Sequence, residues 1–380
     1  MVLQDFRATV LYLTDNPTLG GTIRILQSWL LLAPGRGVQP CVVTPPGSRF
    51  AEWLDAHAIP RTESEMPWFN ARRPWRTAAD IFRVGRWAKA RGVQVVHCNE
   101  HNVYPYGAWL ARWLRVPIVC HMRFIVGADF ARWAFGGRRA PDALLWTSRQ
   151  QREDCAEAMA GLVPDERQHL VPLGLDLAQF GTRVEQRAPT RLGWNVGPGQ
   201  VAVGQACALR ARKRLEEFIE VVAGLAEKDP RVVGVLAGDA MPGDEDYRDR
   251  LQRLVAEPRY RPHVRMLGNI DDIEPFYQGI DIAVSTSEYE TFGNSVCEAM
   301  ACGRPVVGYT GGSVAEVVGD TGRIVATGDT AALSSALATL VDNAALRSEL
   351  GTAARTRVRD EYSPARSFER VSRIYETLVH

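Results

Sequence analysis

The sequence lacks several features that would place it in other classes of protein. No segment reaches the ~18 uninterrupted apolar residues that a membrane-spanning helix needs, and the start, MVLQDFRATVLYLT, has no basic stretch followed by a long apolar run. The seven cysteines are scattered, odd in number and without a CxxC pair, which argues against a zinc or redox motif. These absences predict a cytoplasmic protein whose cysteines are buried free thiols.

A large excess of charge of one sign is also missing. The net charge of +1 argues against a nucleic-acid-binding protein with a broad basic face. The charge is nevertheless uneven, because residues 1–180 carry 21 basic and 16 acidic side chains, whereas residues 181–380 carry 24 and 28. At 380 residues the chain is too long for one ordinary core and fits two domains.

Short apolar runs alternate with amphipathic stretches twice along the chain. ATVLYLT, PCVVT, VQVVHC and VPIVCH come first, and QVAVGQA, VVGVLAG, DIAVST and PVVGYT follow a polar, Gly- and Pro-containing patch that begins near Thr182. Near-continuous apolar strands separated by helices are typical of a parallel sheet covered on both faces. We therefore predict two doubly wound, Rossmann-like α/β domains, residues 1–180 and 181–361.

The stretch SEYETFGNSVCEAMACGRPVV, which starts at Ser287, holds two glutamates around a predicted helix start. DIAVST is the expected strand, SEYETFG the loop and NSVCEAMAC the helix, which Gly303 and Pro305 end. In open α/β sheets, ligands bind where strands lead into helices in this way. Glu290 then lies on the loop, and Glu298 lies about one turn into the helix.

The same helix start is a candidate phosphate site. The amides of Gly293, Asn294 and Ser295 have no acceptor within the helix, and the helix dipole favours an anion there. Carboxylates beside such a site do not bind phosphate, but they suit the hydroxyls on either side of it, as in a ribose diphosphate linked to a sugar. The alternative is that Glu298 only assists the helix electrostatically and Glu290 is solvated.

These residues resemble a known family. EYETFGNSVCEAMACGRPVVGYTGGSVAEVV, with GNIDDIEPFYQGIDIAVSTS before it and GRIVATGD after it, is similar to the C-terminal signature of the retaining nucleotide-sugar glycosyltransferases of family 4, which have the GT-B fold. Segments LGGTIRILQSWLLLAPGRG, VCHMRF, TSRQQRED, VPLGLDLAQF and RKRLEEFI also resemble family segments in the right order. The resemblance implies a central cleft between the domains and a C-terminal helix, residues 362–380, that packs back toward the first domain.

The resemblance assigns the two glutamates separate roles. Glu298 matches the residue that holds the ribose hydroxyls, and Glu290 matches the one that contacts hydroxyls of the transferred sugar. Phe292 and Gly293 occupy the expected slots between them. The family likeness also extends to two glycine turns. Gly20 and Gly21, in the turn after the first strand, resemble the loop that lines the donor phosphate or the acceptor side of the cleft. Gly311, Gly312 and Glu316 resemble a second glycine turn and helix start near the donor.

Lys213, in RARKRLEEF, matches the lysine that neutralises the diphosphate. Without the family, the basic residues there would be taken for a solvated face. The arginine that normally accompanies this lysine falls at Ala208, so Arg210 or Arg212 would have to supply the missing charge. His121, at the end of VPIVCH, matches a histidine that faces the transferred sugar, although a strand-end histidine alone would be taken as structural.

The family implies retention at the anomeric carbon, and no residue stands out as a covalent nucleophile. Helix amides and Lys213 would stabilise the leaving diphosphate, so we expect no metal or other cofactor. The expected donor is a UDP- or GDP-sugar, and the acceptor is a glycan, a lipid-linked molecule or a small molecule in cell-surface polysaccharide or glycoconjugate synthesis. Other GT-B enzymes, such as an epimerase or a phosphorylase, and an idle nucleotide-sugar binding protein are the alternatives.

Tryptophan is concentrated in the first half of the chain, where nine of the ten lie within residues 1–150. Most of them are expected in the core. The stretch MPWFNARRPWR, however, interleaves Trp68, Phe69 and Trp75 with three arginines and has no clear periodicity. We expect it to be either a packed segment or an acceptor loop that touches lipid headgroups on the cytoplasmic face of the inner membrane.

Overall fold

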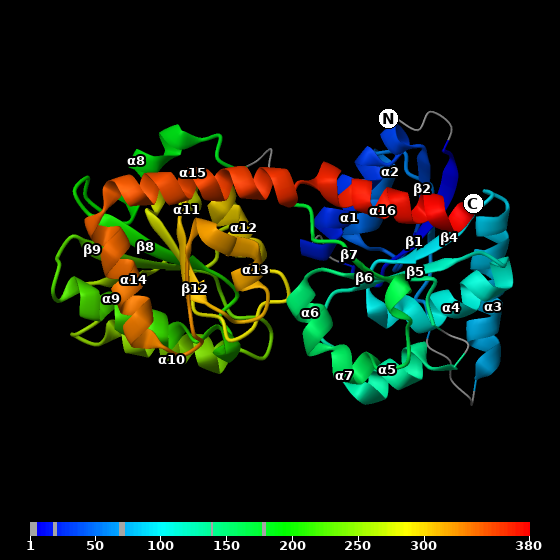
Figure 1. Ribbon diagram of the computed structural model, residues 1–380, viewed down its shortest axis with the longest axis horizontal. Coiled ribbons are helices and arrows are strands. Elements are labelled where there is room, and N and C mark those ends of the chain that lie inside the picture. The colour runs from blue at the N-terminus through cyan, green and yellow to red at the C-terminus, as the bar shows by residue number, and fades with distance from the viewer. Residues whose placement is uncertain (1–5, 18–20, 68–72, 138–139, 177–179) are drawn as a thin grey trace. The chain divides into compact units, whose positions relative to one another are not determined.

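The computed structural model describes residues 6–17, 21–67, 73–137, 140–176 and 180–380 (Figure 1). The chain divides into two compact units. Unit 1 comprises residues 1–174 together with 364–380, and unit 2 comprises residues 175–363. Each unit contains one parallel β-sheet of its own. The predicted pair of Rossmann-like α/β domains is therefore confirmed.

Unit 1 is built on a seven-stranded sheet in the order β3-β2-β1-β4-β5-β6-β7. Leu11 on β1, an inner strand, pairs in register with Cys41 on one side and Val96 on the other, and all three side chains are buried. The apolar runs seen in the sequence thus form strands that are covered on both faces. The strands are β1 (Ala8–Leu13), β2 (Val38–Thr44), β3 (Arg61–Glu63), β4 (Val95–Cys98), β5 (Ile118–Met122), β6 (Ala143–Trp146) and β7 (Gln168–Leu170).

The helices of unit 1 come from both ends of the chain. Figure 1 shows the red helix α16 lying against the blue helix α1, and Phe368, Val371 and Tyr375 of α16 are buried. Ser48 and Ser148 cap α2 and α6 by accepting a hydrogen bond from a first-turn amide. The helices are α1 (Gly21–Leu32), α2 (Arg49–Ala56), α3 (Pro74–Lys89), α4 (Tyr104–Leu114), α5 (Ala128–Phe135), α6 (Arg149–Asp154), α7 (Ala156–Met159) and α16 (Pro364–Val379).

Unit 2 repeats this design with a six-stranded sheet in the order β10-β9-β8-β11-β12-β13. Its strands are β8 (Val201–Ala206), β9 (Val232–Ala237), β10 (Val264–Met266), β11 (Ile282–Ser285), β12 (Val306–Tyr309) and β13 (Arg323–Val325). Its helices are α8 (Arg187–Gly193), α9 (Leu215–Ala226), α10 (Glu245–Ala256), α11 (Glu274–Gly279), α12 (Asn294–Ala301), α13 (Val314–Val318), α14 (Thr330–Asp342) and α15 (Ala344–Glu361).

The strand order of each sheet reverses beside its first strand. In unit 1 the reversal lies between β1 and β4, and in unit 2 it lies between β8 and β11. At such a point the loops leaving the two strands turn to opposite faces and open a crevice at the carboxyl edge. The residues after β1 and β4, and those after β8 and β11, are therefore the positions where ligand-binding groups are expected.

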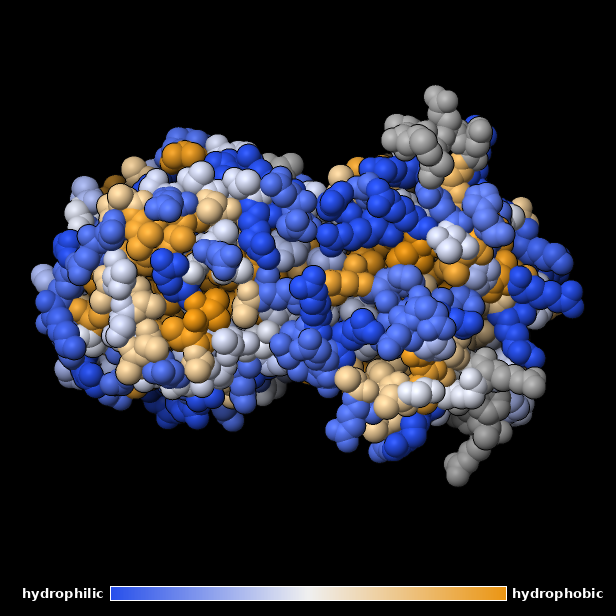
Figure 2. Space-filling view, in the orientation of Figure 1, coloured by the Kyte–Doolittle hydropathy of each residue, from blue (hydrophilic) through white to orange (hydrophobic). Residues whose placement is uncertain are grey.

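Hydrophobic residues are exposed on the surface of both units. On the face drawn in Figure 2, hydrophobic and hydrophilic residues are interspersed over both units. Within the described ranges, every helix is too short or too polar to cross a bilayer.

Candidate active site

The candidate site in unit 2 begins where β11 leads into α12. Gly293 is the residue before the helix and has a φ of +90°, a left-handed conformation that glycine adopts without strain. Glu290 lies on the loop and Glu298 lies in α12. Phe292 is buried, and its ring meets that of Tyr362 edge to face at 5.3 Å. The helix therefore starts where the sequence indicated, with Asn294 and Ser295 as its first residues.

Glu290 and Lys213 form a buried ion pair. The ammonium of Lys213 donates to Oε1 of Glu290, and the hydroxyl of Ser287 donates to the same oxygen at 2.7 Å. The side chains of Lys213 and Glu290 are only 8% and 13% exposed. The structure thus brings together the cation and the loop carboxylate, and it adds Ser287, which sequence analysis missed.

Backbone contacts hold the loops after β8 and β11 against each other. The hydroxyl of Thr286 donates to the carbonyl of Lys213 at 2.8 Å, and the amide of Glu288 donates to the carbonyl of Arg212 at 2.8 Å. The guanidinium of Arg212 in turn donates to the carbonyl of Tyr289 at 2.7 Å. Arg212 is therefore used to join the two loops, and this places Lys213 under the Glu290 loop.

A third loop closes over Glu290 and requires glycine. A Cβ atom at Gly312 would lie 2.2 Å from the carbonyl oxygen of Glu290, and one at Gly311 would lie 2.3 Å from that of Ser287. The amide of Ser313 donates to the Glu290 carbonyl at 2.8 Å. The Gly-Gly turn after β12 therefore supports the loop that carries Glu290. Glu316 follows in α13, where its carbonyl accepts from Arg357.

Glu298 has a buried partner on a neighbouring helix. The hydroxyl of Tyr277, on α11, donates to Oε2 of Glu298 at 2.9 Å. Burial, and then the charge of Glu298, raise the pKa of Tyr277 well above its ordinary value, so the phenol keeps its proton and acts as the donor. Tyr277 is a positioning residue that the sequence signals only by its place in the α11 segment EPFYQG.

The arginines around Ala208 already have partners. Nε of Arg210 lies 2.7 Å from Oδ2 of Asp244, the residue that precedes α10, and its side chain is 41% exposed. Arg214 pairs with Glu217 at 2.6 Å. Arg210 was an expected substitute for the arginine missing at Ala208. In this structure its guanidinium instead forms an ion pair with Asp244.

In unit 1, His121 is fully buried on β5. Its ring stacks on Trp29 with a centroid distance of 5.6 Å, and within the described part of the chain neither ring nitrogen has a hydrogen-bond partner. Burial, and then the positive charge of Arg123, hold the pKa of His121 well below its ordinary value. The histidine is therefore neutral. Gly21 is the first residue of α1, and Gly20 lies outside the described residues.

Beside His121, a polar cluster that sequence analysis missed lies at the ends of β4 and β5. The side-chain amide of Asn99 donates to Oε1 of Glu100 at 2.5 Å, and its oxygen accepts from Arg123 at 2.8 Å. Among the described residues, Oε2 of Glu100 and Nη1 of Arg123 have no partner. Burial raises the pKa of Glu100 to about 7, against the lowering effect of Arg123. The signal in the sequence was the polar run CNEH directly after an apolar strand.

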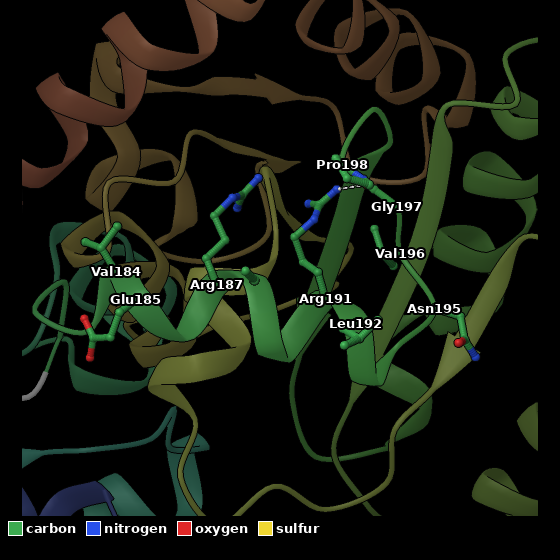
Figure 3. A pocket seen from close by; sticks show the side chains of 10 residues that line it. Val184, Glu185, Arg187, Arg191, Leu192, Asn195, Val196, Gly197 and Pro198 are labelled. Carbon is green, nitrogen blue, oxygen red and sulfur yellow. Dashed lines mark hydrogen bonds between the residues drawn. The ribbon is translucent and has the colours of Figure 1, made fainter.

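A large cavity in unit 2 lies away from these residues. It has a volume of about 810 Å³, and Figure 3 shows it beside α8, with the arginines of that helix turned toward the sheet. Arg187 and Arg191 both bind the carboxylate of Asp281, which precedes β11. The cavity is therefore at the amino edge of the sheet, and none of its lining residues belongs to the candidate site.

Comparison with known families matches most of the chain in two parts. Residues 197–357 match the family described as glycosyl transferases group 1, and residues 20–179 match glycosyltransferase family 4. Among curated proteins, the chain is 25% identical over 312 residues to the lipopolysaccharide core biosynthesis mannosyltransferase LpcC of Rhizobium leguminosarum bv. viciae, covering 80% of this chain and 83% of that protein. It is 27% identical over 311 residues to the phosphatidyl-myo-inositol mannosyltransferase of Mycobacterium leprae, covering 78% and 77%.

Solved structures show the same fold over nearly the whole chain. HepE of Anabaena in complex with UDP superposes with a TM-score of 0.84 at 21% identity, covering 97% of this chain and 100% of that one. A glycosyltransferase of Rickettsia africae gives a TM-score of 0.85 at 17% identity, covering 98% and 99%. Sequence, fold and relatives agree, and the chain belongs to the family 4 glycosyltransferases, enzymes with two Rossmann-like units in the GT-B arrangement.

Proposed function

We propose that the protein transfers a sugar from a nucleoside diphosphate sugar, with retention at the anomeric carbon and without a metal ion. The acceptor is a glycan, a lipid-linked molecule or a small molecule used in cell-surface polysaccharide or glycoconjugate synthesis. The observation that carries this proposal is the buried contact of Lys213 with Glu290 beside the start of α12. It joins a cation for the diphosphate to a carboxylate for the sugar.

The leaving diphosphate is the group that most needs stabilisation. As the bond to the sugar breaks, negative charge grows on the diphosphate, and fixed donors at that position lower the barrier. The first amides of α12 and the ammonium of Lys213 supply such donors in unit 2. Gly293, with its left-handed backbone, removes the side chain that would otherwise keep the phosphates from the amides.

The two glutamates would hold the groups on either side of the diphosphate. Glu298, oriented by Tyr277, would accept hydrogen bonds from the ribose hydroxyls. Glu290, oriented by Ser287 and Lys213, would accept hydrogen bonds from the transferred sugar. Because Lys213 contacts Glu290, a shift of the ammonium toward the growing phosphate charge would change the hydrogen bonds that Glu290 makes to the sugar.

The relatives support the class of donor and acceptor. Structures of HepE contain UDP and UDP-glucose, which supports a nucleoside diphosphate sugar as donor. The named relatives include mannosyltransferases of lipopolysaccharide core and of phosphatidyl-myo-inositol, which supports an acceptor in glycoconjugate synthesis. The seven cysteines are unpaired thiols, six of them buried, and this supports a cytoplasmic enzyme.

A donor panel tests the proposal. Purified protein is incubated with UDP- and GDP-sugars and with acceptor extracts, and the release of nucleoside diphosphate is measured with and without EDTA. Acceptor-dependent release that survives EDTA is expected with one of these donors, and NMR of the product should show the anomeric configuration of the donor. Inversion would exclude the retaining mechanism, and loss of activity in EDTA that only a divalent cation restores would exclude metal independence.

A further inference from the structure

Large aromatic side chains are exposed on two neighbouring helices of unit 1. On α3, Trp75 is 63% exposed and Phe82 is 53% exposed, and on α4, Trp109 is 50% exposed and Trp113 is 39% exposed. These four belong to helices that pack against each other, as Figure 1 also shows. In unit 2, no Trp or Phe of the described chain is comparably exposed. Phe124 and Trp133 are also exposed in unit 1, but outside these two helices. The outer side of α3 and α4, which we call the α3–α4 face, therefore differs from the surface of unit 2.

The aromatic rings of the two helices form one surface. The rings of Phe82 and Trp113 meet edge to face with a centroid distance of 6.0 Å. Trp113 is seated over Gly85, where a Cβ atom would come within 2.5 Å of the indole ring. Trp109 precedes Trp113 by one helical turn and therefore lies on the same side of α4. The rings are held in position by neighbouring residues and not by burial.

The segment that carries these rings has a large excess of positive charge. Residues 73–115 contain eight Lys and Arg residues and only two acidic residues, Asp80 and Glu100. Glu100 is buried, and Asp80 is occupied by hydrogen bonds from Ser64, Tyr106 and Arg83. Glu63 and Glu65 line one pocket with Arg73, Arg76 and Arg83, and Asp142 lines another with Arg112, so acids outside residues 73–115 offset part of this charge. Exposed basic residues on or next to the two helices are Arg73, Arg76, Arg83, Arg86, Lys89, Arg91, Arg112 and Arg115.

We propose that the α3–α4 face docks on an anionic lipid bilayer. Tryptophan and phenylalanine partition into the headgroup region, and arginine binds lipid phosphates while its stem covers apolar surface. Arg86 illustrates the combination, because its guanidinium lies 5.8 Å from the ring centre of Phe82. Arg73, Arg76 and Arg83 share one pocket, but Arg86, Lys89, Arg91, Arg112 and Arg115 are spread along or beside both helices, so the charge complementarity is with a surface.

The proposal changes the position of the contact expected from the sequence. The stretch MPWFNARRPWR was the expected lipid-facing segment, and its Trp68, Phe69 and Arg72 lie outside the described residues. The described part of the surface begins with Arg73 and Trp75 and continues over α3 to α4. The inference does not depend on the donor, the metal requirement or the stereochemistry proposed above, because lipid binding is measured without sugar transfer.

Vesicle binding tests the proposal directly. Full-length protein is floated with vesicles of phosphatidylcholine alone or mixed with phosphatidylglycerol, at low and at high salt. Binding is expected only to the mixed vesicles, and it should weaken strongly in high salt because exposed charges are screened within about 10 Å at 0.1 M. Absence of binding to the anionic vesicles in low salt overturns the proposal, as does equal binding to both vesicle types.

Two pairs of variants identify the surface. Trp75→Ser with Trp109→Ser should lower affinity for the anionic vesicles at least tenfold. Val184→Ser with Leu192→Ser, which changes two well-exposed apolar residues of unit 2, should leave it unchanged. Arg86→Gln with Arg112→Gln should lower affinity about fivefold per arginine, and Arg253→Gln with Arg261→Gln is the matched control. All four side chains of the two α3–α4 variants are exposed, so thermal melting should confirm folding.

The controls also separate the bilayer from a protein partner. Equal losses in the unit 2 controls would show that the α3–α4 face is not the contact surface. Sedimentation without vesicles tests whether the α3–α4 face joins two copies of the chain. The partner would be a second copy, and not a bilayer, if the protein fails to bind vesicles but self-associates with increasing concentration, and if Trp75→Ser with Trp109→Ser abolishes that association.

Discussion

The carboxyl edges of the two sheets differ in how their buried polar groups are paired. Both sheets reverse their strand order at the corresponding place. In unit 2, the carboxylates there have hydrogen-bond donors: Lys213 and Ser287 for Glu290, and Tyr277 for Glu298. In unit 1, Oε2 of Glu100, Nη1 of Arg123 and both ring nitrogens of His121 are buried without a partner among the described residues.

This difference separates the position of a site from its chemistry. The topology places a ligand-binding edge at the same point of both sheets. The pairing of side chains then decides what the edge can do. A carboxylate with fixed donors is already oriented for a ligand, whereas an unpaired buried group costs free energy that a water molecule, a proton or a ligand must offset.

Breaking the Lys213–Glu290 pair should have the largest effect. Lys213→Ala leaves Glu290 buried without its cation, and we expect a loss of about 3–5 kcal/mol in the free energy of unfolding of unit 2. Turnover should also fall at least tenfold, which corresponds to about 1.4 kcal/mol of transition-state stabilisation. Urea unfolding and initial rates measure the two losses.

The double variant Lys213→Met with Glu290→Gln separates stability from catalysis. It removes both charges, so most of the lost stability should return. Turnover should stay low because the diphosphate still lacks its cation. A double variant that regains turnover together with stability would assign the pair a purely structural role.

The buried carboxyl of Glu100 in unit 1 should make stability depend on pH. Because burial raises the pKa of Glu100 from about 4.5 to about 7, the folded state binds the proton more tightly than the unfolded state. The stabilisation is complete below pH 4.5 and is lost as the pH rises through 7, a change of about 3 kcal/mol in the free energy of unfolding. Nine of the ten tryptophans lie within residues 1–150, so tryptophan fluorescence during urea unfolding reports on unit 1.

Glu100→Gln is the control for this effect, because its side chain is neutral at every pH. The variant should therefore lose less stability than the wild type between pH 4.5 and 8. The pKa values of His97 and His101 are lowered to about 3 and about 4 by burial, so these groups change stability in the opposite sense below pH 6.5. Both histidines are present in the wild type and in the variant, so their contributions cancel when the two curves of unfolding free energy against pH are subtracted. Parallel pH curves would contradict a buried, titrating Glu100.

The two glutamates of unit 2 should respond differently to substitution. Glu298→Gln should weaken the binding of donor and of free nucleoside diphosphate alike, by about 1.5–3 kcal/mol, because the ribose contact is present before and after transfer. Glu290→Ala should lower turnover more than nucleotide affinity. Isothermal titration with nucleoside diphosphate and steady-state rates test these separate roles. The same losses of affinity and turnover in both variants would contradict them.

Arg210 gives the smallest of these effects. If its guanidinium leaves Asp244 for the bound diphosphate, Arg210→Ala lowers turnover about tenfold, or about 1.4 kcal/mol. Arg214→Ala is a matched control, because Arg214 also holds an acidic partner and is similarly exposed. Equal tolerance of both substitutions in rate assays would show that this loop does not replace the arginine missing at Ala208.

Local patterns predicted the elements of the fold well. Apolar runs identified inner strands of both sheets but not the short edge strands β3 and β7, and the Gly-Asn start and Gly-x-Pro end identified α12. The family likeness confirmed by comparison singled out Glu290, Glu298 and Lys213, and the structure places Lys213 and Glu290 in contact. These inferences needed only neighbouring residues or a known motif.

Contacts between distant residues could not be predicted in the same way. Tyr277 reaches Glu298 from another helix, and Arg123 meets Asn99 across two strand ends. Arg210 was expected to turn toward the phosphates, and its partner Asp244 lies on a different loop. Each of these pairings depends on how loops from separate strands pack, which periodicity does not encode.

The position of α16 has a consequence for synthesis on the ribosome. Tyr375 in α16 places its hydroxyl 2.6 Å from Nδ1 of buried His97, and Ser367 donates to the carbonyl of Pro172 at 2.7 Å. The rest of unit 1 leaves the exit tunnel first, but α16 emerges only after all of residues 175–363 have been synthesised. Unit 2, which is continuous in sequence, can finish folding while unit 1 still exposes the surface around Trp29 and His97. Nascent chains stalled before residue 364 should therefore hold one finished unit and one that recruits a chaperone.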